Sequence, residues 1–387
     1  MINAFGNGAG NPFLVIYLHN LRGFRLALAG LVGTTSATCA LIAAGLAGYL
    51  ADRYSARITM IAGLILSATG WTLYPLVHKP WEALIAAIFT GAGVGTWLTM
   101  QSTVLALVTP AAVRHAAFAQ QRVAANLGLG FGGLTAGLIV TTARPATFST
   151  IFVLNAATFL VYTVFVARLR IPRAIAPRIR AGYREVLRDK AFRRVALLNL
   201  GYVAISVALV GSMFPVFARN YTGASERLIG LLFLVNSLLI IVAQMPIARA
   251  IEGHRRVRTL AVTCVAFAGT WAFVELAGVV SAGRVAIVLL FAAFAVLSIG
   301  ECLYDATYGP LVADLAPEGR TGHYMATSGL SWQVALIAVP ATSGAILGAA
   351  PLLLWPLAIA LSLVLVIASL RLEPHLPVNA RRTPIPD

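Results

Sequence analysis

The stretch GYLADRYSAR, from Gly48 to Arg57, places an aspartate and two arginines between two long apolar runs. Charge is scarce in the rest of the sequence, because 59% of the 387 residues are hydrophobic and only 11% are charged. A soluble chain of this length would carry far more charge, typically about 25%. The composition therefore indicates a membrane protein, in which GYLADRYSAR is a short loop outside the bilayer.

The apolar runs on either side of this loop belong to a series that continues along the whole chain. Each run is about 18 to 26 residues long, enough to cross a hydrocarbon core of about 30 Å as a helix. We predict twelve spans, at 2–19, 26–50, 58–77, 83–108, 118–140, 150–167, 195–217, 228–250, 259–279, 285–308, 324–347 and 351–370. The predicted fold class is thus an all-α polytopic membrane protein made of two six-helix halves.

The longest interruption in this series sets the expected domain boundaries. We assign an N-terminal half, a basic cytoplasmic linker, a C-terminal half and a cytoplasmic tail to residues 1–167, 168–194, 195–371 and 372–387. Several landmarks recur in the same order in both halves, which indicates duplication of a six-helix unit. The pairs are Pro12 with Pro215, Asp52 with the Glu252–Arg256 region, Pro110 with Pro317, and Gly137 with Gly344. Two such repeats around a central path are typical of secondary transporters.

The distribution of Lys and Arg predicts the orientation of the chain. If the Gly48–Arg57 loop is cytoplasmic, both termini and 22 of the 29 basic residues lie inside, and seven lie outside. The linker at 168–194 holds ten of them and could contact anionic lipid headgroups. The formal net charge of +16 then follows from the positive-inside bias, and we expect no nucleic-acid partner.

The ends of the chain and its cysteines carry less information. The first span has no basic leader and no cleavage site, so we expect no cleavable signal peptide. Met1 opens almost directly into this span, and we expect the natural start to lie upstream. Cys39, Cys264 and Cys302 fall inside predicted spans, which implies no disulfide framework.

The charged loop carries a family resemblance. It matches the pattern G-x-L-a-D-R-x-G-R-[KR] at Gly48, Leu50, Ala51, Asp52, Arg53 and Arg57. This resembles loop 2–3 of the major facilitator superfamily, specifically its twelve-helix drug/proton antiporter branch, whose fold has two halves around a central cavity. The resemblance implies that Gly48, Asp52, Arg53 and Arg57 gate transport. In the family, this aspartate contacts the cytoplasmic end of a helix in the other half, and the arginines complete a charge network that stabilises the outward-open state. The alternative is a solvated loop with no gating role.

The loop departs from the family pattern at two positions. Ser55 stands where glycine is usual, and Ala56 stands where a basic residue is usual. The serine leaves open whether the loop can make the same turn.

A glycine-rich stretch in the fifth span adds to the resemblance. GLGFGGLTAG, at 128–137, is similar to the antiporter motif g-x-x-x-G-P-x-x-G-G at Gly128, Gly132, Gly133 and Gly137. The same spacing is typical of close helix packing, and this alternative stays open. The stretch also satisfies G-x-G-x-x-G, but no strand precedes it, so dinucleotide binding is excluded. The arginine of the family's helix 4 motif is missing from 83–97.

Two carboxylates in the tenth span are the strongest candidates for chemistry, since charge inside a membrane is costly. Glu301 and Asp305 lie one turn apart on a face that Tyr308 shares and Tyr304 flanks. Carboxylates this close repel each other, and desolvation disfavours their charged forms, so one could exchange a proton near neutral pH. We predict proton coupling or substrate contact at Glu301 and Asp305; the alternative is a structural hydrogen-bond anchor.

Further candidates would line a substrate cavity. Asn3, Asn7 and Asn11 share one face of the first span, where they would contact substrate or water, or else hydrogen-bond a neighbouring helix. The other candidates are Trp97, Gln101, Tyr304, Tyr308 and Trp332. Aromatic groups with few fixed charges suit a bulky lipophilic substrate, although each could equally be packing.

These features predict a proton-coupled exporter of small amphipathic compounds in the cytoplasmic (inner) membrane. We expect a monomer that contacts membrane lipid and uses protons as its coupling ion, without catalytic residues, cofactor or metal. The alternative is a facilitator or symporter for a polar metabolite such as a sugar or an amino acid.

An ATP-driven pump is excluded because Lys79 and Lys190 lie outside any G-x-x-x-x-G-K-[ST] motif, and no hydrolase motif appears. A membrane sensor of the same fold remains conceivable.

Overall fold

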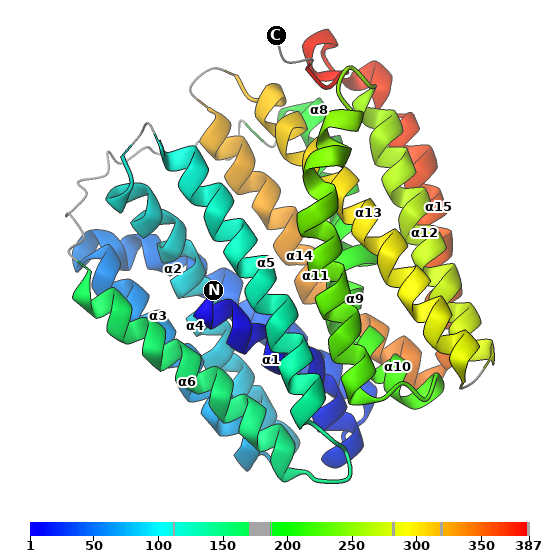
Figure 1. Ribbon diagram of the computed structural model, residues 1–387. Coiled ribbons are helices and arrows are strands. Elements are labelled where there is room, and N and C mark those ends of the chain that lie inside the picture. The colour runs from blue at the N-terminus through cyan, green and yellow to red at the C-terminus, as the bar shows by residue number, and fades with distance from the viewer. Residues whose placement is uncertain (111–112, 170–185, 187, 281–282, 318–319, 385–387) are drawn as a thin grey trace. The chain divides into compact units, whose positions relative to one another are not determined.

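The computed structural model describes residues 1–110, 113–169, 186, 188–280, 283–317 and 320–384. These residues form helices and no strand, apart from one isolated bridge between Arg255 and Arg382. The α-helices of residues 1–168 are α1 (Ile2–Ile16), α2 (Leu26–Arg53), α3 (Ala56–Leu73), α4 (Pro80–Val108), α5 (Arg114–Ile139) and α6 (Ala146–Arg168). Those that follow are α8 (Lys190–Val203), α9 (Leu209–Ser212), α10 (Phe214–Tyr221), α11 (Glu226–Ala250), α12 (Arg256–Val280), α13 (Arg284–Leu315), α14 (Thr321–Ala349) and α15 (Leu354–Leu370) (Figure 1).

Every predicted span corresponds to helical structure. In the described part of the chain, ten helical segments are long and apolar enough to cross a membrane. The other two predicted spans are α1, which has only 15 residues before a π-helical turn, and α5, whose first half carries Gln120, Gln121 and Arg122. The count of twelve membrane crossings therefore stays a prediction.

Two predicted spans differ most clearly from the structure, while the ends of the others shift by a few residues. The span at 195–217 is divided, because a π-helical segment with Ser206 in a non-helical conformation lies between α8 and α9. The span at 285–308 continues as α13 to Leu315, past Pro310. The additional turns bring Asp314 to the side chain of Arg256, where the carboxylate has a cationic partner.

The chain divides into two compact units, and the first comprises residues 1–178, 225–234 and 340–348. In this unit α1 packs on α5 and α6, while α3 packs on α4 and α6 and α2 lies along α4 (Figure 1). Tyr17, Trp71, Tyr74 and Phe152 form an aromatic cluster at its core, with ring centroids 5.1 to 5.9 Å apart. The predicted linker at 168–194 lies largely outside the described residues, so the predicted domain boundaries stay a prediction.

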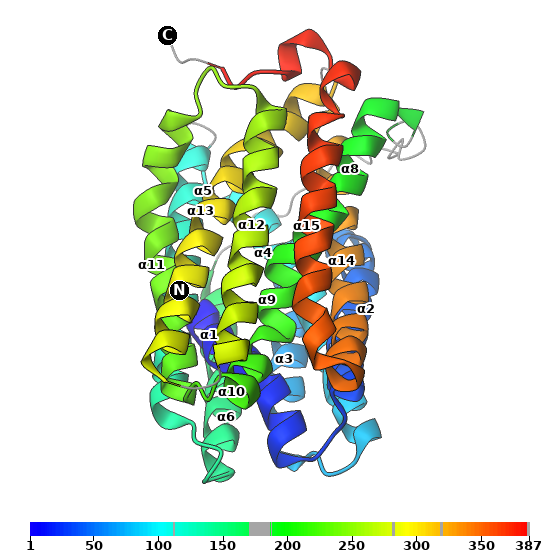
Figure 2. The ribbon, with the colours of Figure 1, turned by 90° about the vertical axis from the view of Figure 1, so that its right-hand side faces the viewer.

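The second unit comprises residues 179–224, 235–339 and 349–387. Here α12 packs against α13 and α15, and α15 packs against α8 (Figure 2). The rings of Trp271 and Trp355 are stacked with their centroids 4.9 Å apart between α12 and α15. The segment after α15 returns to the start of α12, where the Gly253 amide donates to the Thr383 carbonyl oxygen over 3.0 Å. The predicted tail is thus folded against the second unit over its described part.

Candidate functional site

A hydrogen-bonded carboxylate lies within the second unit at the middle of α13. The Asn236 amide of α11 donates to Glu301 Oε2 over 2.9 Å and to Ser298 Oγ over 3.0 Å. Ser298 is buried and its hydroxyl also donates to the Phe294 carbonyl oxygen, so its position is restrained. Glu301 is half-buried, and Asp305 is half-buried one turn further along the same helix. The two carboxylates that the sequence singles out therefore share a helix face, with one of them held by an amide from a second helix.

A second polar chain begins one turn from this carboxylate. The Tyr304 hydroxyl of α13 donates to Asn199 Oδ1 of α8 over 2.5 Å, and Asn199 Nδ2 donates to Ser331 Oγ of α14 over 2.7 Å. Asn199 is 1% exposed, and both polar atoms of its amide have a hydrogen-bond partner, as buried amides require. The chain connects three helices through neutral groups that can each donate and accept, a composition suited to relaying a proton or holding water.

The aromatic candidates of α13 and α14 lie against this chain. The rings of Tyr304 and Tyr308 stack with centroids 5.2 Å apart, and Trp332 lies 6.5 Å from Tyr304. The Tyr308 and Ser328 hydroxyl oxygens lie 2.6 Å apart. The structure thus brings together Glu301, Asp305, Tyr304, Tyr308 and Trp332 in one region of the second unit.

Sequence reasoning missed the partners of these side chains. Asn199, Asn236, Ser298 and Ser331 were not singled out, although each is a polar residue inside an apolar run. An isolated asparagine in a membrane span is the signal that could have found Asn199 and Asn236, because an unsatisfied amide is costly there.

The asparagine face of α1 differs in exposure along its length. Asn3 is 6% exposed, Asn7 is half-buried and Asn11 is exposed. Neither Oδ1 nor Nδ2 of Asn3 has a hydrogen-bond partner among the described residues. Buried amides are normally paired, so Asn3 has capacity for a further ligand or water.

The candidates on α4 have different surroundings. Trp97 is 7% exposed and meets Phe159 of α6 edge-to-face, with ring centroids 6.0 Å apart, which is a packing contact. Gln101 joins three helices, because its Nε2 donates to the Tyr162 hydroxyl over 3.2 Å and its Oε1 accepts from Gln121 over 3.4 Å. Trp97 therefore packs in the interior of the first unit, while Gln101 holds α4, α5 and α6 together.

The glycines of α5 lie at close helix contacts in the first unit. A Cβ on Gly128 would lie 2.6 Å from the Met1 carbonyl oxygen, and one on Gly132 would meet the Phe5 carbonyl oxygen. On the neighbouring face a Cβ on Gly137 would lie 2.6 Å from the Glu226 carbonyl oxygen, and one on Gly133 would lie 3.3 Å from Phe233 Cβ. All four glycines therefore have the packing role that small-residue spacing indicates.

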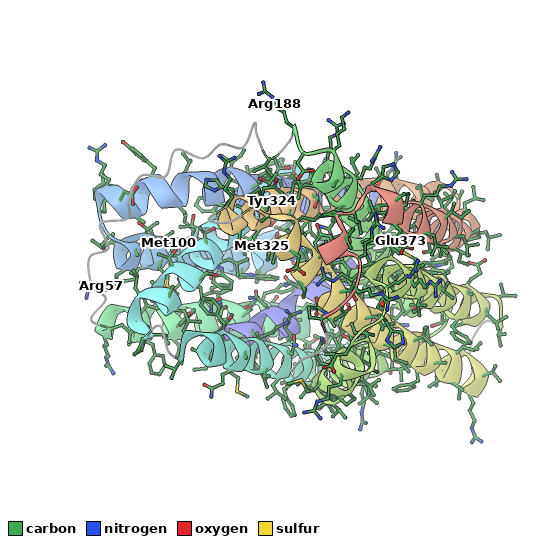
Figure 3. The ribbon with its side chains drawn as sticks, turned by 90° about the horizontal axis from the view of Figure 1, so that it is seen from above. Arg57, Met100, Arg188, Tyr324, Met325 and Glu373 are labelled. Carbon is green, nitrogen blue, oxygen red and sulfur yellow. The ribbon has the colours of Figure 1, made fainter. Side chains whose placement is uncertain are left out.

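The predicted loop at Gly48–Arg57 is almost entirely helical: α2 continues to Arg53 and α3 begins at Ala56, so only Tyr54 and Ser55 lie between them. Gly48, Asp52 and Arg53 in the last two turns of α2 and Arg57 in the first turn of α3 are all exposed. Arg57 Nη1 donates to the Leu169 carbonyl oxygen over 3.4 Å (Figure 3). The turn itself is made by Ser55, whose φ of 179° is extended backbone that any residue adopts, and whose hydroxyl accepts from the Ile58 amide over 3.1 Å. Ser55 thus caps α3, and the turn does not need the glycine that is usual in the family.

No group of three His, Cys, Asp or Glu side chains suited to a metal ion occurs in the described part of the chain. The polar chemistry of the region around Glu301 is carboxylate, amide, hydroxyl and phenol, which suits protons and hydrogen-bonding or amphipathic solutes.

Comparison with known proteins assigns this architecture. The sequence profile of the Major Facilitator Superfamily matches residues 1–217 and 196–385. The MFS-type transporter YhjO of Bacillus subtilis is 23% identical over 87% of this chain and 81% of its own length. The multidrug resistance protein MdtH of Aeromonas salmonicida is 24% identical over 78% of this chain and 75% of its own length. The crystal structure of a D-xylose-proton symporter matches with a TM-score of 0.76 and 14% identity, over 99% of this chain and 98% of that one.

Proposed function

Since the chain belongs to the Major Facilitator Superfamily, we propose that it is a proton-coupled secondary transporter that exports small amphipathic compounds by alternating access. A multi-pass membrane transporter follows from the family and the apolar helices. The exporter assignment is supported by the relatives that are multidrug resistance proteins.

The single observation that carries proton coupling is the environment of Glu301. Its carboxylate lies inside an apolar helix, accepts from Asn236 over 2.9 Å and has Asp305 one turn away. A carboxylate in a membrane span that a second helix holds by a hydrogen bond is a candidate functional site, because an ionisable group there is costly. We propose that Glu301 and Asp305 carry the proton, and that Tyr304, Tyr308 and Trp332 contact the lipophilic substrate beside them.

The charged loop would gate this cycle. We propose that Asp52, Arg53 and Arg57 form charge pairs in one state of the transporter and lose them in the other. The helix cap at Ser55 supports this role, because it holds the start of α3 next to Arg57 in a defined conformation.

The first experiment is proton flux in inside-out vesicles that contain the purified chain. A panel of lipophilic cations and simple metabolites is added to wild type, to Glu301→Gln/Asp305→Asn, and to Glu275→Gln. Glu275 is a matched control, because it is a half-buried carboxylate in a membrane span of the same unit. We expect a lipophilic compound to release protons with wild type and Glu275→Gln but not with the double variant. Movement of compounds without protons, equal in all three, would contradict coupling.

The unpartnered amide of Asn3 favours a second candidate function, a facilitator or symporter for a polar metabolite. Asn3, Asn7 and Asn11 present three amides on one face of α1, and a sugar offers hydroxyl groups for each. In that case wild type should take up a polar solute, and Asn7→Leu and Asn11→Leu should abolish that uptake. For the exporter, the two asparagine variants should transport lipophilic cations as wild type does.

A further inference from the structure

A groove on the second unit lies between the start of α8 and the end of α15. The ribbons of these two helices are neighbours in Figure 2. It has a volume of about 620 Å³ and is lined by Arg194, Leu197, Val364, Ile367, Arg371 and His375, among others. These helices run side by side, because Gly201 of α8 leaves room for Leu365 and the hydroxyl oxygens of Tyr202 and Ser369 lie 2.6 Å apart. The groove is therefore held by packed helices and not by a loop.

The apolar part of the groove faces outward. The side chains of Leu197, Val364 and Ile367 are 65%, 59% and 53% exposed. All three lie in segments that are long and apolar enough to span a membrane. Such side chains are stable when acyl chains cover them.

The other end of the groove is basic. Arg194 lies in the second turn of α8, Arg371 directly follows α15, and His375 lies one turn beyond it, with Nδ1 3.2 Å from the Arg371 carbonyl oxygen. Arg194 and Arg371 are exposed, and within the described part of the chain neither guanidinium is paired with a carboxylate. Two unpaired cations next to an outward apolar surface complement a ligand with an anionic head and hydrocarbon chains.

We propose that this groove is a binding site for an anionic phospholipid, with its phosphate between Arg194 and Arg371 and an acyl chain along Leu197, Val364 and Ile367. Guanidinium groups bind phosphate in bidentate geometry, and basic pockets between membrane helices bind anionic headgroups. None of the residues that line the groove is among those proposed to carry protons or contact substrate.

The test measures which lipid the full-length chain retains. The purified protein is equilibrated with an equimolar mixture of phosphatidylglycerol and phosphatidylcholine in detergent, and bound lipids are counted by native mass spectrometry. We expect wild type to prefer phosphatidylglycerol by at least about tenfold, as the attraction of two basic groups implies. Arg194→Gln/Arg371→Gln should lose this preference. Arg193→Gln/Arg258→Gln removes two exposed arginines that do not line the groove and should keep it.

Two further measurements separate a lipid from a free anion. Ala368→Phe fills the groove without changing charge, and we expect it to lose phosphatidylglycerol as well. Inorganic phosphate in excess should not displace the lipid from wild type, because phosphate lacks acyl chains.

The proposal would be overturned by equal retention of both lipids by wild type, by loss of the preference in the Arg193/Arg258 control, or by displacement of the lipid by inorganic phosphate. A preference that survives Ala368→Phe would overturn it too. Unchanged helical circular dichroism shows that each variant is folded.

Discussion

At the scale of single residues, Ser55 shows how a departure from a family pattern can keep the local turn. Glycine at this position would be needed only for a left-handed backbone, and Ser55 is extended with φ of 179°. Its hydroxyl supplies a cap that glycine lacks, since it accepts from the Ile58 amide. The gating hypothesis for Asp52, Arg53 and Arg57 therefore does not depend on a glycine in this loop.

We predict that Ser55→Gly does not stabilise the protein. It should lower the free energy of unfolding by a few tenths of a kcal/mol, and Ser55→Ala by about 1 kcal/mol, because both remove the cap of α3. Ser55→Thr keeps the hydroxyl and serves as the control. The measurement is thermal unfolding of the purified protein in one detergent. A higher midpoint for Ser55→Gly would show that the turn is strained after all.

The second prediction at this scale concerns Asn236. Asn236→Leu removes the donor to Glu301 Oε2 and leaves the carboxylate without that hydrogen bond. A hydrogen bond to a charged group contributes about 1.5 to 3 kcal/mol, so we expect proton-coupled transport to fall by about tenfold or more. Gln244→Leu is the control, because this amide lies on the same helix and reaches only the Cys302 carbonyl oxygen at 3.5 Å. Equal proton flux in both variants would mean that Asn236 has a structural role only.

At the scale of helices, the contact of α1 with α5 depends on the absence of side chains. Gly128 and Gly132 face the backbone of α1, and a Cβ there would meet the carbonyl oxygens of Met1 and Phe5. Backbone atoms cannot give way as a flexible side chain can, so the two helices would have to separate.

We predict that Gly132→Ala destabilises the protein by about 1 to 3 kcal/mol, the range for overpacking. Gly45→Ala is the matched control, because Gly45 also lies within a helix but nothing lies within 4 Å of its added Cβ. Alanine favours a helix by about 1 kcal/mol relative to glycine, so this variant should be as stable as wild type or more so. Thermal unfolding of both variants measures the difference. Equal destabilisation by the two would argue against close packing.

At the scale of the whole molecule, the second unit is joined by an ion pair between the buried Arg256 and the exposed Asp314, together with its C-terminal segment. The side chain of Arg256 is 1% exposed and donates to Asp314 Oδ2 over 2.5 Å and to the Ala380 carbonyl oxygen over 3.3 Å. Nearby, Arg255 pairs with Glu373 over 2.7 Å (Figure 3). The start of α12, the end of α13 and residues 372–384 are therefore one structural assembly.

We predict that Arg256→Ala lowers the free energy of unfolding by about 1.5 to 3 kcal/mol, because the hydrogen bonds of the buried Arg256 guanidinium to Asp314 and to the Ala380 carbonyl oxygen are lost. Arg256→Met/Asp314→Leu should recover much of this loss, since an apolar side chain can fill the space of the buried guanidinium. Arg258→Ala, an exposed arginine on the same helix, is the control and should change little. Denaturant titration measures all three. A double variant as unstable as Arg256→Ala would indicate that its bond to Ala380 matters more than the ion pair.

The sequence by itself determined the class of protein, the places of the helices and the family. Whether a segment enters a bilayer depends on the summed hydropathy of about 20 consecutive residues, which is a local property of the chain. The charges of Gly48–Arg57 likewise marked locally where two spans meet, although α2 continues to Arg53 and α3 begins at Ala56, so the loop itself is only Tyr54 and Ser55. Glu301 and Asp305 also stood out locally, as charges within an apolar run.

Only the tertiary structure decided which polar groups meet. Asn199 reaches Tyr304, Asn236 reaches Glu301, and Arg256 reaches Asp314, each pair from different helices. Such a pairing depends on the rotation and separation of two helices, and several rotations satisfy the same apolar pattern when lipid and protein interior are equally apolar. Hydropathy therefore placed the helices, and only the packing of each unit could show how their polar groups are paired.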